Sequence, residues 1–215
     1  LSFKLALSTV LVLFPLGLLV GRFLALSTSK LKPWLEACIL LPLVLPPTVL
    51  GFYLLAAFSP ISGFGQWVQQ WFGVSLAFEF SGLLLASLLF NLPFMIQPIQ
   101  RALEAVPRDL LEAAQVCGLS RLQSFLQVEL PLAWSGLATG VLLTFVHTLG
   151  EFGVVLMIGG SIPGKTQTLS IAIYDSVQAF DTQSANQMAL SLLAFALVAV
   201  ALTYLISSKA RRVHR

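Results

Sequence analysis

The eight residues from Gly159 to Thr166 carry the clearest chemical pattern in the chain, because they satisfy the string G-x-x-x-x-G-K-[ST]. In a nucleotide-binding P-loop, the backbone amides of this string cradle phosphates, the lysine contacts them, and the hydroxyl contacts Mg²⁺. The apolar run from Val154 to Ile158 precedes the string as a strand would. A P-loop ATPase is therefore one hypothesis for the chain.

The surroundings of this string argue against nucleotide chemistry. A P-loop needs a parallel sheet covered by helices, and the flanking sequence offers no soluble length for one. The apolar run that ends at Asp175 follows the string too closely to supply a separate Walker B strand. We therefore expect no nucleotide binding by the isolated chain, and the P-loop ATPase is the less favoured alternative.

His147 and Glu151 form a second pattern, because a spacing of four residues places both on one helical face. Ionisable side chains in or near a membrane span are functional candidates, here as a metal pair or as the proton relay of a secondary transporter. Two ligands do not make a metal site, and we predict none. The favoured interpretation is that Glu151 caps or hydrogen-bonds backbone near the end of a span, while His147 is a packed polar residue.

Three further polar residues, Asn91, Thr144 and Thr148, interrupt apolar runs. Polar side chains in spans tend to face the interior of a helix bundle, so these residues are candidates to line a pathway. Hydrogen bonds between helices would explain each of them equally well. The apolar runs hold no cluster of Lys or Arg, so we expect no tight anion site in this chain.

The composition sets the class of protein to which these residues belong. Of 215 residues, 57% are hydrophobic and 10% are charged, whereas soluble domains carry about a quarter charged residues. The apolar residues come in runs longer than the roughly 10-residue alternating strands of an outer-membrane barrel. We predict an all-α polytopic membrane protein with a single domain over residues 1–215.

The apolar runs predict five spans, at about 5–26, 35–58, 80–100, 132–150 and within 182–208. The second run contains Pro42, Pro46 and Pro47, and we expect it to pack inside the bundle, where protein covers the freed carbonyls. Residues 59–77 look like an interfacial loop with an amphipathic turn that carries Trp67 and Trp71. The pieces 152–164 and 166–174 are too short to span alone and would form a re-entrant hairpin or a tilted helix. Six spans result if they cross fully.

The positive charges predict the orientation. With five spans, ten of the twelve Lys and Arg residues fall on one side, and only Lys4 and Lys165 fall on the other. The positive-inside rule places the window 101–131 and the C-terminus in the cytoplasm. The basic tail from Lys209 to Arg215 then serves as a topology anchor that contacts anionic lipid, and not as a nucleic-acid contact.

The window 101–131 is a polar interruption between apolar runs, so it must lie in water and is a candidate docking surface. Pro107 can start a helix over 108–116, and Gly118 can end it. Ser120 is a plausible N-cap for a second short helix over 121–128, and Pro131 lies just before the next span. We expect two short helices with a bend at Gly118.

The order of residues in this window resembles the EAA loop of ABC-importer permeases. The pattern is Glu-Ala-Ala, three residues, Gly, nine residues, Ile, any residue, Leu-Pro, and Val128 in place of Ile is the one departure. In that family the loop is the coupling helix that sits in a groove of the ATPase subunit. The resemblance assigns the coupling role to Glu112, Ala113, Ala114, Gly118, Leu130 and Pro131.

Other stretches look like the molybdate/tungstate permeases of this family. They are Leu-Pro-Leu-Val-Leu-Pro-Pro at 41–47, Leu-Gly-Glu-Phe-Gly at 149–153, Ile-Pro-Gly at 162–164 and Thr-x-Thr at 166–168. Sulfate permeases share the second of these elements. The resemblance implies the membrane subunit of an oxyanion importer, most naturally for molybdate, with tungstate or sulfate/thiosulfate as the alternatives.

The resemblance also implies the partners. In that family two permeases pair around a central path, here as a homodimer, and two ABC ATPase subunits drive transport. A periplasmic or lipid-anchored binding protein delivers the substrate. The chain would then be a transport subunit and not an enzyme, it would bind no cofactor, and the partner would use ATP. Its location would be the bacterial or archaeal cytoplasmic membrane.

Overall fold

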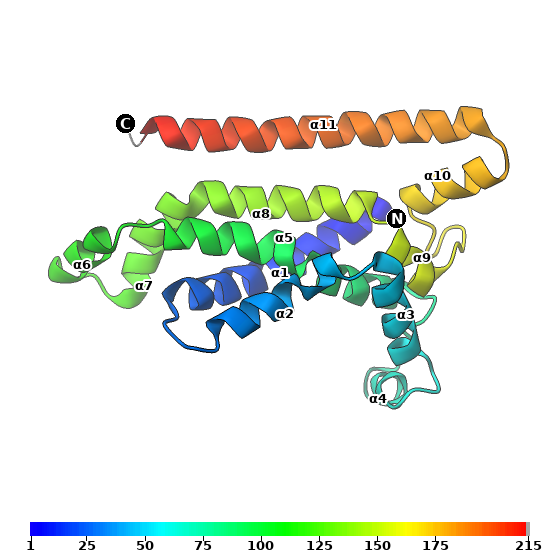
Figure 1. Cartoon of the computed structure of the whole chain (residues 1–215), viewed down its shortest axis with the longest axis horizontal. Coiled ribbons are helices and arrows are strands. Elements are labelled where there is room, and N and C mark those ends of the chain that lie inside the picture. The colour runs from blue at the N-terminus through cyan, green and yellow to red at the C-terminus, as the bar shows by residue number, and fades with distance from the viewer. Residues whose placement is uncertain (214–215) are drawn as a thin grey trace.

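The computed structural model describes the backbone of residues 1–213 and the side chains of residues 1–202, and every regular element in that part is helical (Figure 1). The all-α prediction is therefore confirmed. The elements are α1 (Ser2–Leu26), α2 (Lys32–Val44), α3 (Pro47–Phe58), α4 (Gly63–Phe72), α5 (Phe80–Glu104), α6 (Arg108–Val116), α7 (Arg121–Ser124), the π-helical turn η1 (Phe125–Glu129), α8 (Leu130–Gly150), α9 (Gly153–Gly159), α10 (Leu169–Gln178) and α11 (Thr182–Val213).

Four helical stretches are long and apolar enough to cross a membrane, namely Ser2–Leu26, Phe80–Glu104, Arg121–Gly150 and Thr182–Leu202. The pair α2 and α3 makes a fifth candidate, broken by a bend of 104°. The predicted spans match these segments. Helices α9 and α10 are short, as predicted for the pieces between the last two spans.

Helices α1, α5 and α8 form the core of the bundle, where Leu13, Met95, Ile99 and Leu137 are buried together. Glycine lets α8 approach α5 closely, because a Cβ added at Gly136 would lie 2.6 Å from the carbonyl oxygen of Pro98. Small residues play this role in membrane bundles, where close packing of helices replaces the hydrophobic effect. The core thus holds α5 and α8 in a fixed relation, and both lead into the polar window.

The broken second span does not pack inside the bundle of this chain, so that prediction is wrong. Only Pro42 of α2 is buried, and Trp34 and Val44 are each more than 70% exposed. The residue before a proline avoids helical geometry, so Leu45 and Pro46 are extended and α3 turns away. Helix α2 therefore meets α5 along one side only, whereas α3 packs against α9.

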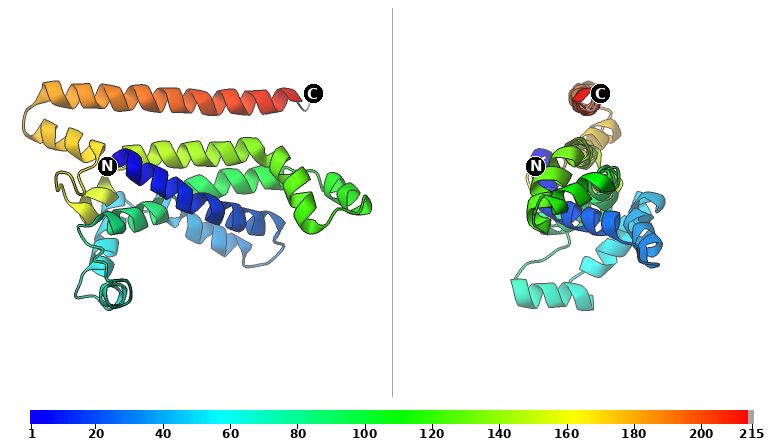
Figure 2. Two further views of the ribbon diagram at one scale, coloured as in Figure 1. Left: turned by 180° about the vertical axis from the view of Figure 1, so that it is seen from behind. Right: turned by 90° about the vertical axis from the view of Figure 1, so that its left-hand side faces the viewer.

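The predicted interfacial loop contains the amphipathic helix α4. Ser62 caps its start by accepting a hydrogen bond from the backbone amide of Gly65, and Gly73 ends it in the left-handed region at φ +66°. Val68 is buried on one face of α4, while Trp67 and Trp71 are exposed on the other. This segment lies at the edge of the molecule, away from α11 (Figure 2).

The second short helix that we predicted over 121–128 is not separate from the next span. Helix α7 continues through η1 into α8, so one helical rod runs from Arg121 to Gly150. In η1 the amide of Leu130 donates to the carbonyl of Phe125, five residues back. Proline removes a backbone donor, and here Pro131 falls in the first turn of α8 directly after the wider π-helical turn. Pro131 therefore does not mark the boundary that the sequence indicated.

The two ends of the bundle differ in charge. Figures 1 and 2 place α6, α7, the turn between α1 and α2, and the end of α11 at one end of the molecule, and α9, α10 and the N-terminus at the other. Arg22, Arg101, Arg108 and Arg121 belong to the first end, as the predicted topology requires. The side chains of the basic tail, Lys209 to Arg215, lie outside the described residues.

Candidate functional site

The stretch from residue 105 to residue 120, here called the bent segment, contains α6 and joins α5 to α7. Helix α6 begins after Pro107, as predicted, and ends at Val116, with Cys117 as its C-cap. Gly118 then takes φ +82°, and a Cβ added there would meet nothing within 4 Å. The positive φ, and not crowding, is therefore what this position needs from glycine.

A capping box starts the helix that leaves the bent segment, so the N-cap prediction for Ser120 is confirmed. The Ser120 hydroxyl accepts a hydrogen bond from the amide of Gln123 at 3.3 Å, and the Gln123 side chain accepts one from the amide of Ser120 at 2.8 Å. Two otherwise unpaired amides are satisfied by this exchange. The bend at Gly118 is thus fixed on its far side by local hydrogen bonds.

The bent segment presents an exposed, mixed surface. Glu112 and Ala113 are exposed, and so is Val116, with 89% of its surface accessible. Ala114, in contrast, is buried beneath the helix. Exposed apolar side chains rimmed by polar residues are typical of a protein contact, and Leu110 and Val116 are exposed in this way. Of the other motif residues, Leu130 is half-buried and Pro131 is exposed, both in α8.

A second group of polar side chains lies inside the bundle, between α5 and the end of α8. Glu151 Oε2 accepts a hydrogen bond from the Ser87 hydroxyl at 2.9 Å and a longer one from Asn91 Nδ2 at 3.5 Å. On its other side, Asn91 Oδ1 lies 3.0 Å from Nδ1 of His147. We call these four residues, Ser87, Asn91, His147 and Glu151, the buried cluster.

The buried cluster corrects one prediction and confirms another. Glu151 does not cap backbone, because its partners are the side chains of Ser87 and Asn91 on α5. His147 is a packed polar residue as predicted, with its ring stacked on that of Phe94 at a centroid distance of 3.9 Å. The sequence offered no sign that Ser87, one serine among many, belongs with Glu151.

The arrangement also bears on the metal and proton-relay hypotheses. Asn91 lies between His147 and Glu151, and no hydrogen bond joins those two directly among the described contacts. An amide donates at nitrogen and accepts at oxygen, so it fixes the orientation of its neighbours and does not exchange a proton as a carboxylate or imidazole does. Across residues 1–202, no group of three His, Cys, Asp or Glu side chains is placed to hold a metal.

Thr144 and Thr148 lie on the same buried side of α8. The Thr148 hydroxyl donates to the carbonyl of Thr144 at 2.8 Å, one turn back in the helix. Asn91 is also fully buried, where it joins α5 to α8 through the buried cluster. A role of these three residues in lining a pathway stays a prediction.

The string from Gly159 to Thr166 is not a P-loop. The apolar run before it is the helix α9 and not a strand. Lys165 forms an ion pair with Glu79 at the start of α5, and the Thr166 hydroxyl donates to the carbonyl of Gly159 at 2.6 Å. The lysine and the hydroxyl that would serve a nucleotide thus tie the α9–α10 connection to the bundle.

Comparison with known proteins identifies a family that matches most of this chain. Residues 14–212 match the family described as "Binding-protein-dependent transport system inner membrane component". The molybdenum transport system permease protein ModB of Azotobacter vinelandii is 42% identical over 95% of this chain and 90% of its own length. The protein of the same name from Haemophilus influenzae is 35% identical over 96% of this chain and 89% of its own length.

A sulfate transport system permease protein, CysT of Salmonella typhimurium, is 36% identical over 85% of this chain and 65% of its own length. Among solved structures, a bacterial alginate ABC transporter in complex with a pentasaccharide-bound periplasmic protein matches 99% of this chain, with 76% of its own chain covered, a TM-score of 0.72 and 19% identity. The MetNI methionine ABC transporter in inward-facing conformations matches 99%, with 90% of its chain covered, a TM-score of 0.68 and 20% identity. These structures share the fold of this chain.

Proposed function

The chain belongs to the family of binding-protein-dependent transport system inner membrane components, and from this premise we propose that it is the permease subunit of an ATP-driven molybdate importer. It is a multi-pass transport subunit and not an enzyme. The observation that supports the substrate most is the 42% identity to a molybdenum permease over nine-tenths of that protein's length. Sulfate is the second candidate, because a sulfate permease is similar over a smaller share of its length.

The bent segment is the proposed contact with an ATPase partner. Its surface carries a carboxylate, a small residue and an apolar side chain on one short helix, at Glu112, Ala113 and Val116. Ala114 supports this surface from beneath by packing inside the chain. A movement of the ATPase would reach the bundle through the two helices that the segment joins, α5 and the rod from Arg121 to Gly150.

The exposed apolar surfaces support two further parts of the proposal, a second copy of the chain and contact with lipid. Helix α2 and the described part of α11 bury few of their residues within the chain. Apolar helix faces at membrane depth must be covered by hydrocarbon or by protein. We infer that two copies pair around the pathway, as a homodimer, and that the remaining surfaces contact lipid.

The distribution of charge supports an orientation with the bent segment in the cytoplasm. The Arg residues at the end that carries α6 lie on one side of the bundle, and Lys4 and Lys165 lie toward the other. Cytoplasmic loops carry such an excess of positive charge. A periplasmic binding protein would then dock at the end of α9 and α10, and ATP would be used by the partner on the cytoplasmic side.

Selectivity for the oxyanion is proposed to depend mainly on the binding protein. The core of the described bundle holds no buried Lys or Arg side chain, and its buried polar groups are hydroxyls, amides and carboxylates. Such a pathway offers no fixed positive charge that would hold an oxyanion tightly. An oxyanion can therefore pass through without being retained at a fixed positive charge.

Uptake by a reconstituted complex tests the proposed function. The permease, its ATPase and its binding protein are placed in proteoliposomes, and accumulation of molybdate is compared with that of sulfate at equal concentrations. We expect ATP-dependent accumulation of molybdate that greatly exceeds that of sulfate. Equal or greater accumulation of sulfate would overturn the substrate, and uptake without the ATPase would overturn the mechanism.

A further inference from the structure

Two ion pairs connect the first two helices of the chain to the helical elements on either side of the bent segment. The first joins Arg22 on α1 to Glu129, the last residue of η1. Two guanidinium nitrogens of Arg22 take part. Nε lies 2.8 Å from Glu129 Oε2, and Nη2 lies 2.8 Å from Oε1. Bidentate pairs of this kind fix orientation as well as distance.

This ion pair lies at the junction between η1 and α8. Glu129 is the point at which the π-helical turn passes into α8, and only 8% of its side chain is exposed. The guanidinium of Arg22 also lies over the ring of Phe125, 4.6 Å from its centroid. Arg22 therefore contacts both the first and the last residue of η1. Single π-helical turns within α-helices often mark functional sites.

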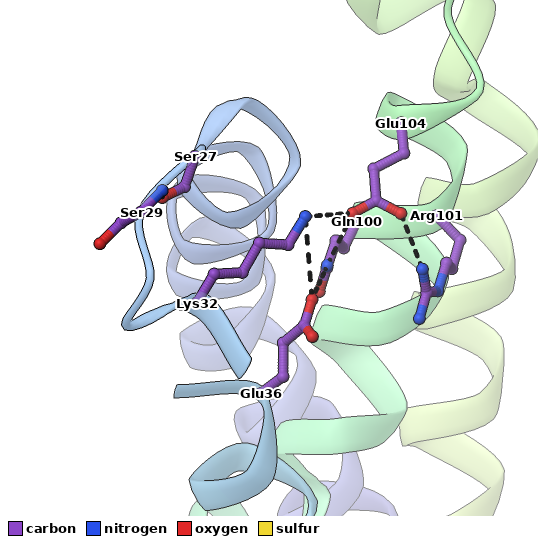
Figure 3. Close-up of polar contacts among 7 residues, drawn as sticks. All are labelled: Ser27, Ser29, Lys32, Glu36, Gln100, Arg101 and Glu104. Atoms are coloured by element: carbon purple, nitrogen blue, oxygen red, sulfur yellow. Dashed lines mark hydrogen bonds and ion pairs between the residues drawn. The ribbon is translucent and has the colours of Figure 1, made fainter. Parts of the chain in front are cut away.

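The second ion pair joins Lys32, the first residue of α2, to Glu104, the last residue of α5, at 2.8 Å (Figure 3). Glu104 also accepts hydrogen bonds from Gln100 and Arg101, each at 2.9 Å. Gln100 further donates to Glu36, which lies one turn after Lys32 in α2. The last turn of α5, where the bent segment begins, is thus tied to the first turn of α2.

A compact turn links Arg22 and Lys32 within the sequence. The Ser27 hydroxyl accepts from the amide of Ser29 at 3.3 Å, and the Ser29 hydroxyl accepts from the amide of Leu31 at 3.2 Å. Such local bonds stabilise a turn in one conformation. Helices α1 and α2 and this turn therefore form a hairpin with one anchor on each side of the bent segment.

Between the two anchors, the hairpin does not pack tightly on α6. An open groove of about 530 Å³ separates them, and its lining includes Thr28 and Lys32 on one side and Arg108 and Glu112 on the other. The main contacts of α6 are with α7 and η1. Among the described residues, these two are the ion pairs that join the hairpin to η1 and to the last turn of α5.

From this geometry we propose that Arg22–Glu129 and Lys32–Glu104 act as a two-point clamp, which makes the α1–α2 hairpin move with the bent segment when the ATPase partner acts on it. The four residues are positioning residues. The inference rests on the proposed ATPase contact but not on the identity of the oxyanion. Without the clamp, α1 would still pack on α5 and α8 in the core, but the charged links that fix the proposed cytoplasmic ends of α1 and α2 relative to η1 and the last turn of α5 would be lost.

Charge reversal and charge exchange test the clamp in the reconstituted complex of permease, ATPase and binding protein. The variants are Arg22→Glu, Glu129→Arg and the double exchange of the two, and the control Lys30→Gln removes a positive charge from the same turn without breaking an ion pair. The readout is the number of ATP molecules hydrolysed per oxyanion transported. A variant that only misfolds would lower the amount of assembled complex and leave this ratio unchanged.

We expect each single reversal to raise the ratio by about 2- to 30-fold, the range that follows from typical coupling energies between sites. The double exchange is expected to restore most of it, and the control to leave it unchanged. Arg22→Lys keeps the positive charge but cannot form the bidentate contact of a guanidinium. We therefore expect a ratio of ATP to oxyanion between those of the wild type and of the reversals. This milder variant serves if a reversal prevents assembly.

An unchanged ratio in Arg22→Glu or Arg22→Lys would overturn the clamp, as would a double exchange that assembles normally and stays uncoupled. If the complex transports sulfate, the clamp is tested in the same way, by comparing between variants how far the binding protein stimulates ATP hydrolysis. Failure of the wild-type complex to prefer molybdate would therefore count against the substrate alone, and the response of hydrolysis to the variants would still decide on the clamp.

Discussion

The two halves of α5 carry polar networks of opposite construction. In its first half, Ser87 and Asn91 belong to the buried cluster, where both side chains donate to one oxygen of Glu151. At its end, Glu104 takes part in an ion pair whose members are each more than a fifth exposed. Separating a buried polar group from its partner leaves it unsatisfied, which costs about 1–3 kcal/mol. An ionic network at the water boundary can break and form again at low free-energy cost, because water solvates the separated charges.

The two polar networks differ in how readily they can rearrange. The buried cluster joins α5 to α8 beside a core in which glycine brings the helices together, so that region is suited to stay rigid. The Lys32–Glu104 pair and the bent segment line an open groove, and this pair is exposed enough for water to replace its contact. We infer that movement originates at the clamp end and that the buried cluster keeps the helices aligned while it passes.

The largest expected effect comes from breaking the buried cluster. Asn91→Leu removes the partner of His147 and one donor to Glu151, and leaves both polar groups buried. We expect a loss of about 1–3 kcal/mol in the free energy of unfolding for each buried polar group that is left without its partner, the usual desolvation cost of such a group. Thermal unfolding of the purified permease in detergent measures it. Asn186→Leu on the exposed surface of α11 is the control, with a change within about 0.5 kcal/mol expected. A loss no larger in Asn91→Leu than in that control would contradict a rigid role.

A smaller effect, confined to assembly, is expected from Glu112→Lys at the opposite end. Because Glu112 is exposed, unfolding of the permease should be unchanged. Loss of a central contact costs about 1–3 kcal/mol of binding energy, which weakens binding of the ATPase subunit by roughly 5- to 150-fold. Affinity measured with the ATPase in solution checks this. Asp181→Lys makes the same change of charge in the α10–α11 connection and is expected to leave that affinity unaltered.

Gly118 and Gly73 provide a matched pair for the role of the bend. Both have positive φ with no atom near an added Cβ, so Gly118→Ala and Gly73→Ala carry similar backbone strain. The cost of each is about 1–2 kcal/mol of stability. Only Gly118→Ala is expected to lower ATP-driven uptake per assembled complex, because only that glycine shapes the proposed contact. Equal loss of uptake in both variants would mean that strain alone, and not the bend, matters.

The smallest effect sharpens the comparison between the two networks. Salt screens partly exposed charges over about 10 Å at 0.1 M but affects buried neutral donors little. The difference in stability between wild type and Lys32→Gln, which removes the partly exposed partner of Glu104, should therefore shrink by a few tenths of a kcal/mol when salt rises from about 0.05 to 0.5 M. The difference between wild type and Asn91→Leu should stay constant. Unfolding series at both salt concentrations measure the two differences, and a parallel shift of both would remove the distinction.

Much of the fold was predictable because its signals are local in the sequence. Long apolar runs predict spans, Pro107 and Gly118 bound α6, and Ser120 caps the next helix, all within a few residues of the element that they define. The motif that we propose as an ATPase contact is equally local, with its polar residues and its glycine in one short window. Such features are determined by backbone geometry and by hydrocarbon thickness, which act on each segment separately.

The pairings across the bundle were decided by the tertiary structure alone. Arg22 and Glu129 are 107 residues apart, and Ser87 meets Glu151 across 64. No periodicity links such residues, because their contact depends on how α1, α5 and α8 rotate against one another around the core. The same packing placed α3 against α9. Sequence by itself therefore determined which segments cross and where the chain bends, and only the packed bundle decided which charges meet.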